Sequence, residues 1–247
     1  MFDWPSITVP LQIIPQTDLP QRAPGGVGAS PDILIAESNH RIANNLTLIA
    51  GLIRLQASGV AREGRTLNAE EARLLLDEVG GRIETVARLH RLLAGAGHGS
   101  VIALGRYLHD IADAAVASMS ARGDITLIST SNDVCEIAAQ QALPVGFIVG
   151  EVVTNAVKYA HPAGVKGRIV LGCHSRPHGA TLIEISDDGV GLPEGFDPRR
   201  DGGLGMRMVR SLADQLGASL NFNSSDIGLT MRLLIPPGRA DETDDLP

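Results

Sequence analysis

The sequence has little cysteine, no excess of positive charge and no long hydrophobic run, and each lack excludes a class of protein. Its two cysteines, Cys135 and Cys173, lie far apart, so they predict neither a disulfide framework nor a zinc site and suit a reducing cytoplasm. With 28 acidic and 21 basic residues, the formal net charge of -7 has the wrong sign for a protein whose main ligand is a nucleic-acid backbone.

The longest apolar stretch, residues 147–153, is interrupted by Gly150 and Glu151 and is too short to cross a lipid bilayer. The N-terminus also lacks the basic region followed by an apolar one that marks a signal peptide. We therefore expect no nucleic-acid partner, no membrane insertion and a cytoplasmic location.

The 247 residues divide into two small domains between two tails. Residues 1–30 contain repeated prolines followed by glycines, which predict a flexible tail that is too short for a sensory domain of ordinary size. Residues 237–247 are acidic and predict a second tail. Between them we expect a helical domain over residues 31–97 and an α/β domain over residues 98–236.

The helical domain is predicted to be a hairpin of two long helices. Apolar residues recur at helical spacing from Ser30 to about Ala57, and again from about Asn68 to Leu93. Neither helix has a wholly polar side, so an isolated hairpin would expose apolar surface to water. Because pairing two hairpins gives a four-helix bundle, we expect a homodimer.

The second domain combines strands and helices. Short runs rich in β-branched and apolar residues predict strands, and longer runs with helical spacing predict helices. This order indicates a layered α/β sandwich. The predicted strands are residues 125–130, 168–174, 181–186, 219–223 and 230–235, and the predicted helices are residues 102–119, 140–159 and 204–216.

A histidine with polar neighbours lies on the first predicted helix. An apolar stripe that includes Ile42 faces inward, and His40 lies on the opposite side. Glu37 and Asn44 flank His40 at i-3 and i+4, where helical side chains meet. A neutral imidazole is a good nucleophile when a carboxylate such as Glu37 holds its other N–H. Taken alone, an exposed helical histidine is more often an ordinary solvated residue.

Polar residues on the predicted helix 140–159 form the first part of a second site. Glu151, Asn155 and Lys158 are spaced at i, i+4 and i+7, which places them on or near one face. A carboxylate and an amide one turn apart can hold a hydrated magnesium ion, and a lysine can reach a phosphate. An ordinary solvent-facing stripe would have the same spacing.

Two glycine-containing turns form the rest of this site. Asp187 follows a predicted strand, and Gly189 and Gly191 after it let a ligand approach the backbone closely. Gly203 and Gly205 open the predicted helix 204–216, whose first N–H groups and dipole favour phosphate. Each turn alone is a weak signal.

The order of these segments resembles that of bacterial histidine kinases. Residues 37–46, ESNHRIANNL, closely resemble the phospho-acceptor box of the HWE-related group. EVVTNAVKYA from Glu151 is similar to the kinase N box, DDGVG from Asp187 to the G1 box, and GLGM from Gly203 to the G2 box. The resemblance covers residues 32–236. It implies a HisKA type-2 dimerisation and phosphotransfer hairpin followed by a Bergerat-type ATP-binding sandwich of the GHKL superfamily.

The resemblance also implies a role for each matching residue. His40 becomes the phospho-acceptor, with Glu37 and Asn44 as catalytic neighbours. Asn155 becomes the magnesium-holding residue, and Asp187 the partner of the adenine amino group. The other implied residues are Glu151 and Lys158 at the phosphates, Gly189 and Gly191 in the G1 turn, Gly203, Leu204 and Gly205 at the end of a lid of residues 192–202, and Thr230 beside the adenine.

The implied function is transfer of the ATP γ-phosphoryl group, with Mg²⁺, to His40 and then to an aspartate of a response regulator receiver domain. Ala43 stands where the family often has lysine, and Trp4 is the only tryptophan, so the Trp-x-Glu element of strict HWE kinases is absent. These departures leave open a phosphatase or phosphorelay adaptor with weak kinase activity, and a non-catalytic, ATP-responsive dimeric scaffold. A GHKL serine kinase would share the ATP site without needing the His40 helix.

Overall fold

The computed structural model describes residues 50, 51, 53, 54, 57, 68–93, 100–119, 124–130, 135–161 and 165–237. The predicted phospho-acceptor box with Glu37, His40 and Asn44 lies outside the described residues, as does most of the first predicted helix. The N-terminal tail and residues 238–247 of the acidic tail also lie outside them. The second hairpin helix and most of the predicted α/β domain are described.

The second hairpin helix, α2, spans Ala69–Leu92 and begins where the sequence predicts. A capping box fixes its start, because the Asn68 side chain accepts from the Glu71 backbone N–H and the Glu71 side chain accepts from the Asn68 N–H, both at 2.9 Å. Acidic residues in the first turn and basic residues in the last turn complement the helix dipole.

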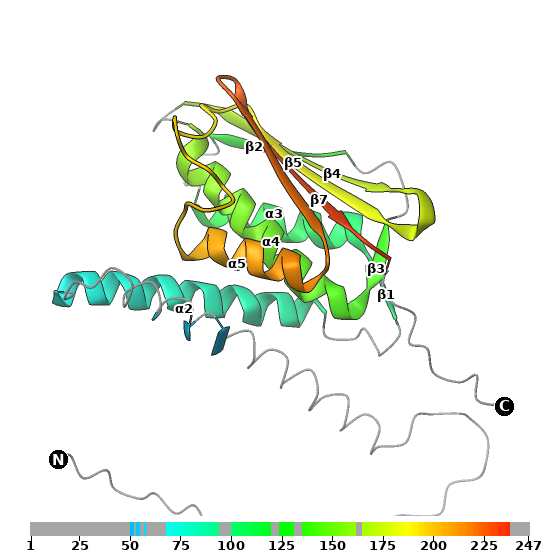
Figure 1. The fold of residues 1–247 in the computed structure, drawn as a ribbon, viewed down its shortest axis with the longest axis horizontal. Helices are drawn as coiled ribbons and strands as arrows, with labels where there is room; N and C mark the ends of the chain where they lie inside the picture. Colours follow the sequence, from blue (N-terminus) through cyan, green and yellow to red (C-terminus); the bar gives the residue numbers. More distant parts are fainter. Residues whose placement is uncertain are drawn as a thin grey trace, which may run out of the picture.

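The α/β domain is built on a five-stranded mixed sheet in the order β2-β4-β5-β7-β6. Only β2 and β4 run parallel, and the other neighbours are antiparallel. Helices α3, α4 and α5 cover one face of this sheet (Figure 1). The strands are β2 (Ile125–Ser129), β4 (Gly167–Ser175), β5 (Thr181–Asp187), β6 (Ser219–Ser225) and β7 (Gly228–Ile235), and the helices are α3 (Leu104–Met119), α4 (Ala139–Asn155) and α5 (Leu204–Gln215).

These bounds confirm the five predicted strands to within two residues, but three local details differ from the prediction. Two three-residue strands, β1 (Val101–Ala103) and β3 (Glu136–Ala138), pair antiparallel, so α3 begins later than expected. The predicted helix 140–159 changes after α4 into a π-helical turn, Ala156–Ala160. A 3-10 turn, Pro177–Gly179, precedes β5. Segments this short have no readable periodicity.

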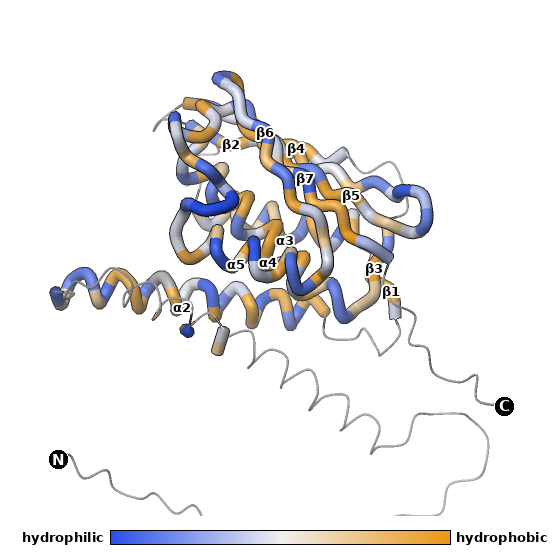
Figure 2. The backbone as a smooth tube through the Cα atoms, viewed as in Figure 1, coloured by the Kyte–Doolittle hydropathy of each residue, from blue (hydrophilic) through white to orange (hydrophobic). Residues whose placement is uncertain are grey.

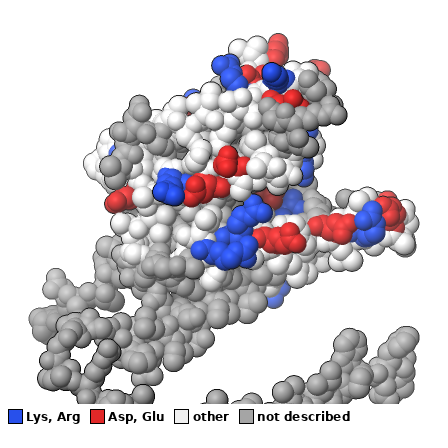
Figure 3. Space-filling model, turned by 180° about the vertical axis from the view of Figure 1, so that it is seen from behind, with Lys and Arg blue, Asp and Glu red and all other residues white. Residues whose placement is uncertain are grey.

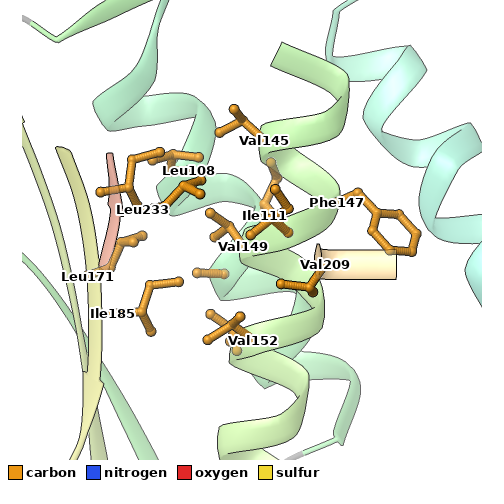
Figure 4. Packing of buried hydrophobic residues seen from close by; sticks show 14 of the residues in the cluster. Leu108, Ile111, Val145, Phe147, Val149, Val152, Leu171, Ile185, Val209 and Leu233 are labelled. Atoms are coloured by element: carbon orange, nitrogen blue, oxygen red, sulfur yellow. The ribbon is translucent and has the colours of Figure 1, made fainter. Parts of the chain in front are cut away.

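The core lies between the sheet and α4, which is apolar almost all round. Val149 and Val152 point from α4 toward strands that carry Ile185 and Leu233, whereas Phe147 points away from the sheet (Figure 4). All five side chains are buried. Apolar segments concentrate on the strands and on the helix faces turned toward them, whereas the segment joining β5 to α5 is largely hydrophilic (Figure 2). A helix buried on opposite sides explains the near absence of polar residues in α4.

Helix α2 forms a third layer on the side of α4 opposite the sheet (Figure 1). Val86, Leu89 and Leu93, spaced by three and four residues, are buried in the same core as α4. Gly146 makes this contact close, because a Cβ there would collide with the Tyr107 hydroxyl and the Leu89 side chain. One face of α2 is therefore covered by the α/β domain of the same chain.

The other sides of α2 are exposed. Figure 3 shows acidic and basic side chains next to one another along this helix. Arg73 pairs with Glu70 at 2.6 Å and with Asp77 at 2.9 Å, and all three side chains are exposed. Such pairs contribute little stability but keep the surface solvated. Leu74 and Leu76 are also exposed. No helix in the described part of the chain has both the length and the hydropathy to cross a membrane.

Candidate functional site

A fixed carboxylate stands at the end of β5, the central strand of the sheet. Oδ1 of Asp187 accepts hydrogen bonds from the backbone N–H of Gly189 at 3.0 Å and of Leu229 at 3.3 Å. Oδ2 accepts no hydrogen bond from any described residue. The side chain is therefore oriented by one oxygen and presents the other as an acceptor for a ligand N–H group.

Glycines allow the turn after Asp187 to lie against two neighbouring segments. A Cβ at Gly189 would collide with the carbonyl group of Ala160, at the end of the π-helical turn. Gly191 has a φ of 69°, and a Cβ there would collide with the carbonyl oxygen of Ser225. At both predicted G1 positions, therefore, the structure leaves no room for a side chain larger than that of glycine.

Thr230, predicted to lie beside the same site, is on β7. It pairs in register with Ser186, the residue before Asp187, and is half-buried. The structure therefore places Thr230 on the strand adjacent to the acidic turn.

The polar residues predicted on the helix 140–159 differ in burial, from buried at its middle to exposed at its end. Glu151 is buried, Asn155 is half-buried, and Lys158 and Tyr159 are exposed on the π-helical turn. The spacing therefore does not describe an ordinary solvent-facing stripe, because its first member lies inside the protein.

Glu151 is engaged by an arginine that the sequence analysis did not identify. Arg82 of α2 approaches its carboxylate with Nε 3.2 Å from Oε1 and Nη2 3.3 Å from Oε2, and both side chains are nearly buried. The only sequence signal for such a partner is the position of Glu151 within the apolar stretch 147–153, because a buried carboxylate requires a compensating charge. In this conformation Glu151 joins the α/β domain to α2 rather than facing an open site.

Asn155 faces the first turn of α5. Its Nδ2 contacts Sδ of Met206 at 3.8 Å, and its Oδ1 accepts no hydrogen bond from the described residues. A single free amide oxygen fits a Mg²⁺ ion whose other ligands are water and phosphate. Within the described ranges, no group of three or more His, Cys, Asp or Glu residues could form an all-protein metal site.

The start of α5 has the features expected of a phosphate site. Gly203 is the N-cap residue, no side chain caps the helix, and the first N–H groups are therefore available to an anion. Leu204 is buried, and a Cβ at Gly205 would collide with the Glu151 carboxylate. Gly203 has open space around it and an ordinary φ of -70°, whereas Gly202 has a φ of 101°. The conformational need for glycine thus falls on Gly202.

The predicted lid, residues 192–202, joins β5 to α5 and contains turns but no regular helix or strand. Arg210 of α5 donates from Nη1 to the carbonyl oxygens of Pro198 at 2.7 Å and Asp201 at 2.8 Å. The Asp197 carboxylate accepts from the Arg199 backbone N–H at 2.9 Å, which lowers the pKa of Asp197. The sequence analysis missed Arg210, which has no motif around it.

The structure therefore brings the ATP-site residues of the sequence analysis to one end of the helical layer, and it does not describe the phospho-acceptor residues. The sheet, its three covering helices, the acidic turn and the glycine-rich start of α5 together define an ATP-binding domain of the GHKL fold. The residues gathered there are Glu151, Asn155, Lys158, Asp187, Gly189, Gly191, Gly203, Leu204, Gly205 and Thr230.

Two family models match the chain. The model described as histidine kinase matches residues 37–119, and the model described as histidine kinase-, DNA gyrase B-, and HSP90-like ATPase matches residues 140–239. Together they cover most of the sequence, in the order expected from the motifs. The chain belongs to the histidine kinases.

Curated relatives agree with this assignment. Blue-light-activated histidine kinase 2 of Erythrobacter litoralis is 31% identical over 225 residues, which are 90% of this chain and 60% of the relative. Sensor histidine kinase PdtaS of Mycobacterium tuberculosis is 30% identical over 216 residues, 85% of this chain and 40% of the relative. The chain thus spans less than two thirds of the length of these relatives.

Solved structures show the same similarity. The EL346 blue-light activated histidine kinase of Erythrobacter litoralis superposes over 89% of this chain and 64% of its own, with a TM-score of 0.64 and 27% identity. The histidine kinase domain of that protein superposes over 77% of this chain and 95% of its own, with a TM-score of 0.55 and 27% identity.

Proposed function

We propose that this chain is an ATP-dependent protein histidine kinase that phosphorylates its own His40 and passes the phosphoryl group to an aspartate of a response regulator receiver domain. The observation that carries the proposal is the Asp187 carboxylate, which two backbone N–H groups fix so that Oδ2 remains available to a ligand. The exocyclic amino group of adenine is a matching donor. Because ATP is the proposed phosphoryl donor, the proposal includes a cytoplasmic location.

Asn155, Lys158 and the start of α5 have features consistent with nucleotide binding. Asn155 would hold Mg²⁺ through its free amide oxygen, and Lys158, exposed on the π-helical turn, would contact phosphate. The uncapped start of α5 would bind phosphate oxygens through backbone N–H groups. A bound Mg²⁺ would supply charge neutralisation between the phosphates.

The assignment of His40 as the acceptor rests on the family motif, since His40 lies outside the described residues. Phosphoryl transfer depends mainly on positioning and electrostatic stabilisation, so a neutral imidazole brought in line with the γ-phosphate suffices as the nucleophile. Glu37 and Asn44 are proposed to orient that imidazole. The exposed Leu74 and Leu76 of α2 support the proposal that the hairpin forms a homodimer.

Incubation of the purified chain with Mg²⁺ and γ-labelled ATP tests this proposal. We expect label that survives alkali and is lost in acid, as a phosphoramidate is. His40→Gln should abolish labelling without impairing nucleotide binding, because glutamine keeps the helix and removes the nucleophilic nitrogen. Asn155→Ala should abolish labelling through loss of the metal ligand.

The outcomes separate the alternatives. Acid-labile label that persists in the His40→Gln variant would refute the acceptor assignment. Nucleotide binding without any label in the unmodified chain, with or without a regulator, would favour a phosphatase or phosphorelay adaptor, or an ATP-responsive scaffold.

A further inference from the structure

A histidine with a nearly buried side chain lies beside the candidate nucleotide site and is used by none of the family motifs. His161 follows the π-helical turn Ala156–Ala160, and its side chain is only 7% exposed. Its ring packs so closely on Gly167 that a Cβ at Gly167 would collide with it. Nε2 lies 2.9 Å from Oδ1 of Asp188, whereas Nδ1 is buried without a hydrogen-bond partner among the described residues.

Asp188 collects hydrogen bonds from two segments that are distant in sequence. Besides His161, it accepts from the backbone N–H of Arg168 at 2.7 Å and from Nε of Arg168 at 2.9 Å. Burial alone would raise the pKa of Asp188, but these hydrogen bonds outweigh it and lower the pKa to about 2. The carboxylate is thus ionised near neutral pH, so Nε2 of His161 carries the proton of the shared hydrogen bond.

This arrangement fixes the end of the N-box helix to the G1 turn. Asp188 directly follows Asp187, the proposed adenine partner, and His161 directly follows the turn that carries Lys158. A second link runs parallel to the first, since the Val190 backbone N–H donates to the carbonyl oxygen of Ala160 at 2.9 Å. The two sides of the nucleotide site are therefore held together by one side-chain bond and one backbone bond.

The π-helical turn gives the side-chain bond its importance. π-Helical turns are rare and occur mostly as single turns within α-helices, frequently at functional sites. Residues 156–160 are such a turn, and they carry the exposed Lys158 and Tyr159. His161 is the first residue after the turn, with an extended backbone, and its imidazole anchors the turn to a charged acceptor. Hydrogen bonds to a charged group are stronger than those between neutral groups.

We infer that His161 is a positioning residue for nucleotide binding, which acts through Asp188 to hold the adenine-side turn and the phosphate-side turn at a fixed separation. The inference rests on the proposed function, because it assigns the adenine to Asp187 and a phosphate to Lys158. His161 itself does not contact the nucleotide. Loss of its hydrogen bond lets residues 156–160 shift relative to residues 187–191, which weakens binding at both ends of the ligand.

Calorimetry of ADP binding to the full chain, with thermal unfolding measured in parallel, tests the inference. His161→Phe keeps a ring against Gly167 and removes the donor, and we expect the Kd for ADP to rise about tenfold. His161→Gln places an amide N–H near the position of Nε2 and should restore the Kd to within about twofold of the unmodified chain.

A control histidine is available on α3. His109 is exposed but also makes a side-chain hydrogen bond of 2.9 Å, between its Nδ1 and Oγ of Ser129, which links it to β2 and not to the G1 turn. His109→Phe should leave the Kd for ADP unchanged even if it lowers the unfolding temperature. A purely structural role for His161 predicts that His161→Phe behaves like this control, and that result would overturn the inference.

The double substitution of His161→Phe with Asp188→Asn gives a second measurement. If His161 acts through Asp188, the effects of the two changes on the Kd are less than additive, whereas full additivity contradicts the proposed route. Failure of the unmodified chain to bind ADP would instead refute the proposed function, so the two failures are distinguishable.

Discussion

Replacing Asp187 by asparagine changes the side chain that is proposed to recognise adenine while leaving its surroundings almost intact. Oδ1 of Asp187 accepts from the backbone N–H groups of Gly189 and Leu229. The oxygen of an asparagine can accept both hydrogen bonds, so the turn should remain folded. The amide nitrogen then replaces Oδ2 and presents N–H donors to the donor amino group of adenine.

The magnitude of the effect follows from this donor-to-donor mismatch. Removing one partner of a hydrogen bond in a desolvated site costs about 1 to 3 kcal/mol, because the remaining donor stays unsatisfied. This corresponds to a roughly fivefold to hundredfold weaker affinity for ADP. Inosine diphosphate has a carbonyl oxygen in place of the amino group, so the variant should bind it more tightly than the unmodified chain does.

Isothermal titration calorimetry with ADP and inosine diphosphate measures both effects, and circular dichroism checks that the variant is folded. Asp214→Asn is a matched control, because Asp214 is an exposed carboxylate near the C-terminal end of α5, whereas the candidate site lies at the N-terminal end. It should change neither affinity. An unchanged ADP affinity in a folded Asp187→Asn variant would mean that Asp187 does not bind the adenine.

Three further predictions concern stability. Arg82→Met removes the ion pair between Arg82 and the buried Glu151 carboxylate, so urea unfolding should show a loss of about 3 kcal/mol, and adding Glu151→Gln should recover most of it. Gly189→Ala places a Cβ against a backbone carbonyl group and should lower the melting temperature, whereas Gly203→Ala meets open space and should lower it less, through the poorer N-cap alone; equal effects would contradict the geometry. The pKa of Asp188 is lowered from 3.8 to about 2, so its stabilising contribution is complete above about pH 4 and is lost as the pH falls to about 2. The stability difference between the unmodified chain and Asp188→Asn, measured by urea unfolding, should therefore shrink over that interval.

Much of the framework could be predicted because its signals are local. The β-branched runs mark the five strands of the sheet to within two residues. The helical spacing marks the start of α2 near Asn68, where the structure shows a capping box, and Gly217, whose φ is 62°, follows the end of α5. The acidic turn at Asp187 and the glycines around it were predicted because the motif and the steric requirement fall on the same few residues.

Other features depend on contacts between distant parts of the chain. Arg82 and Glu151 are separated by 69 positions, so no local pattern connects them. His161 had no motif to support it, and its role follows from the approach of Asp188, which only the folded sheet creates. The π-helical turn is likewise hidden, because helical periodicity over five residues does not distinguish a π turn from an α turn.

The covered face of α2 limits how this helix can be used. Val86, Leu89 and Leu93 are buried against the ATP-binding domain, so in this conformation they are unavailable to the core of a four-helix bundle. Leu74 and Leu76, nearer the start of the helix, remain exposed. If the proposed homodimer forms its bundle through α2, the helix is divided along its length between the bundle and the ATP-binding domain, and a bundle that extended through Leu93 would have to displace that domain. Domain release and completion of the bundle would then be one coupled step rather than two independent ones.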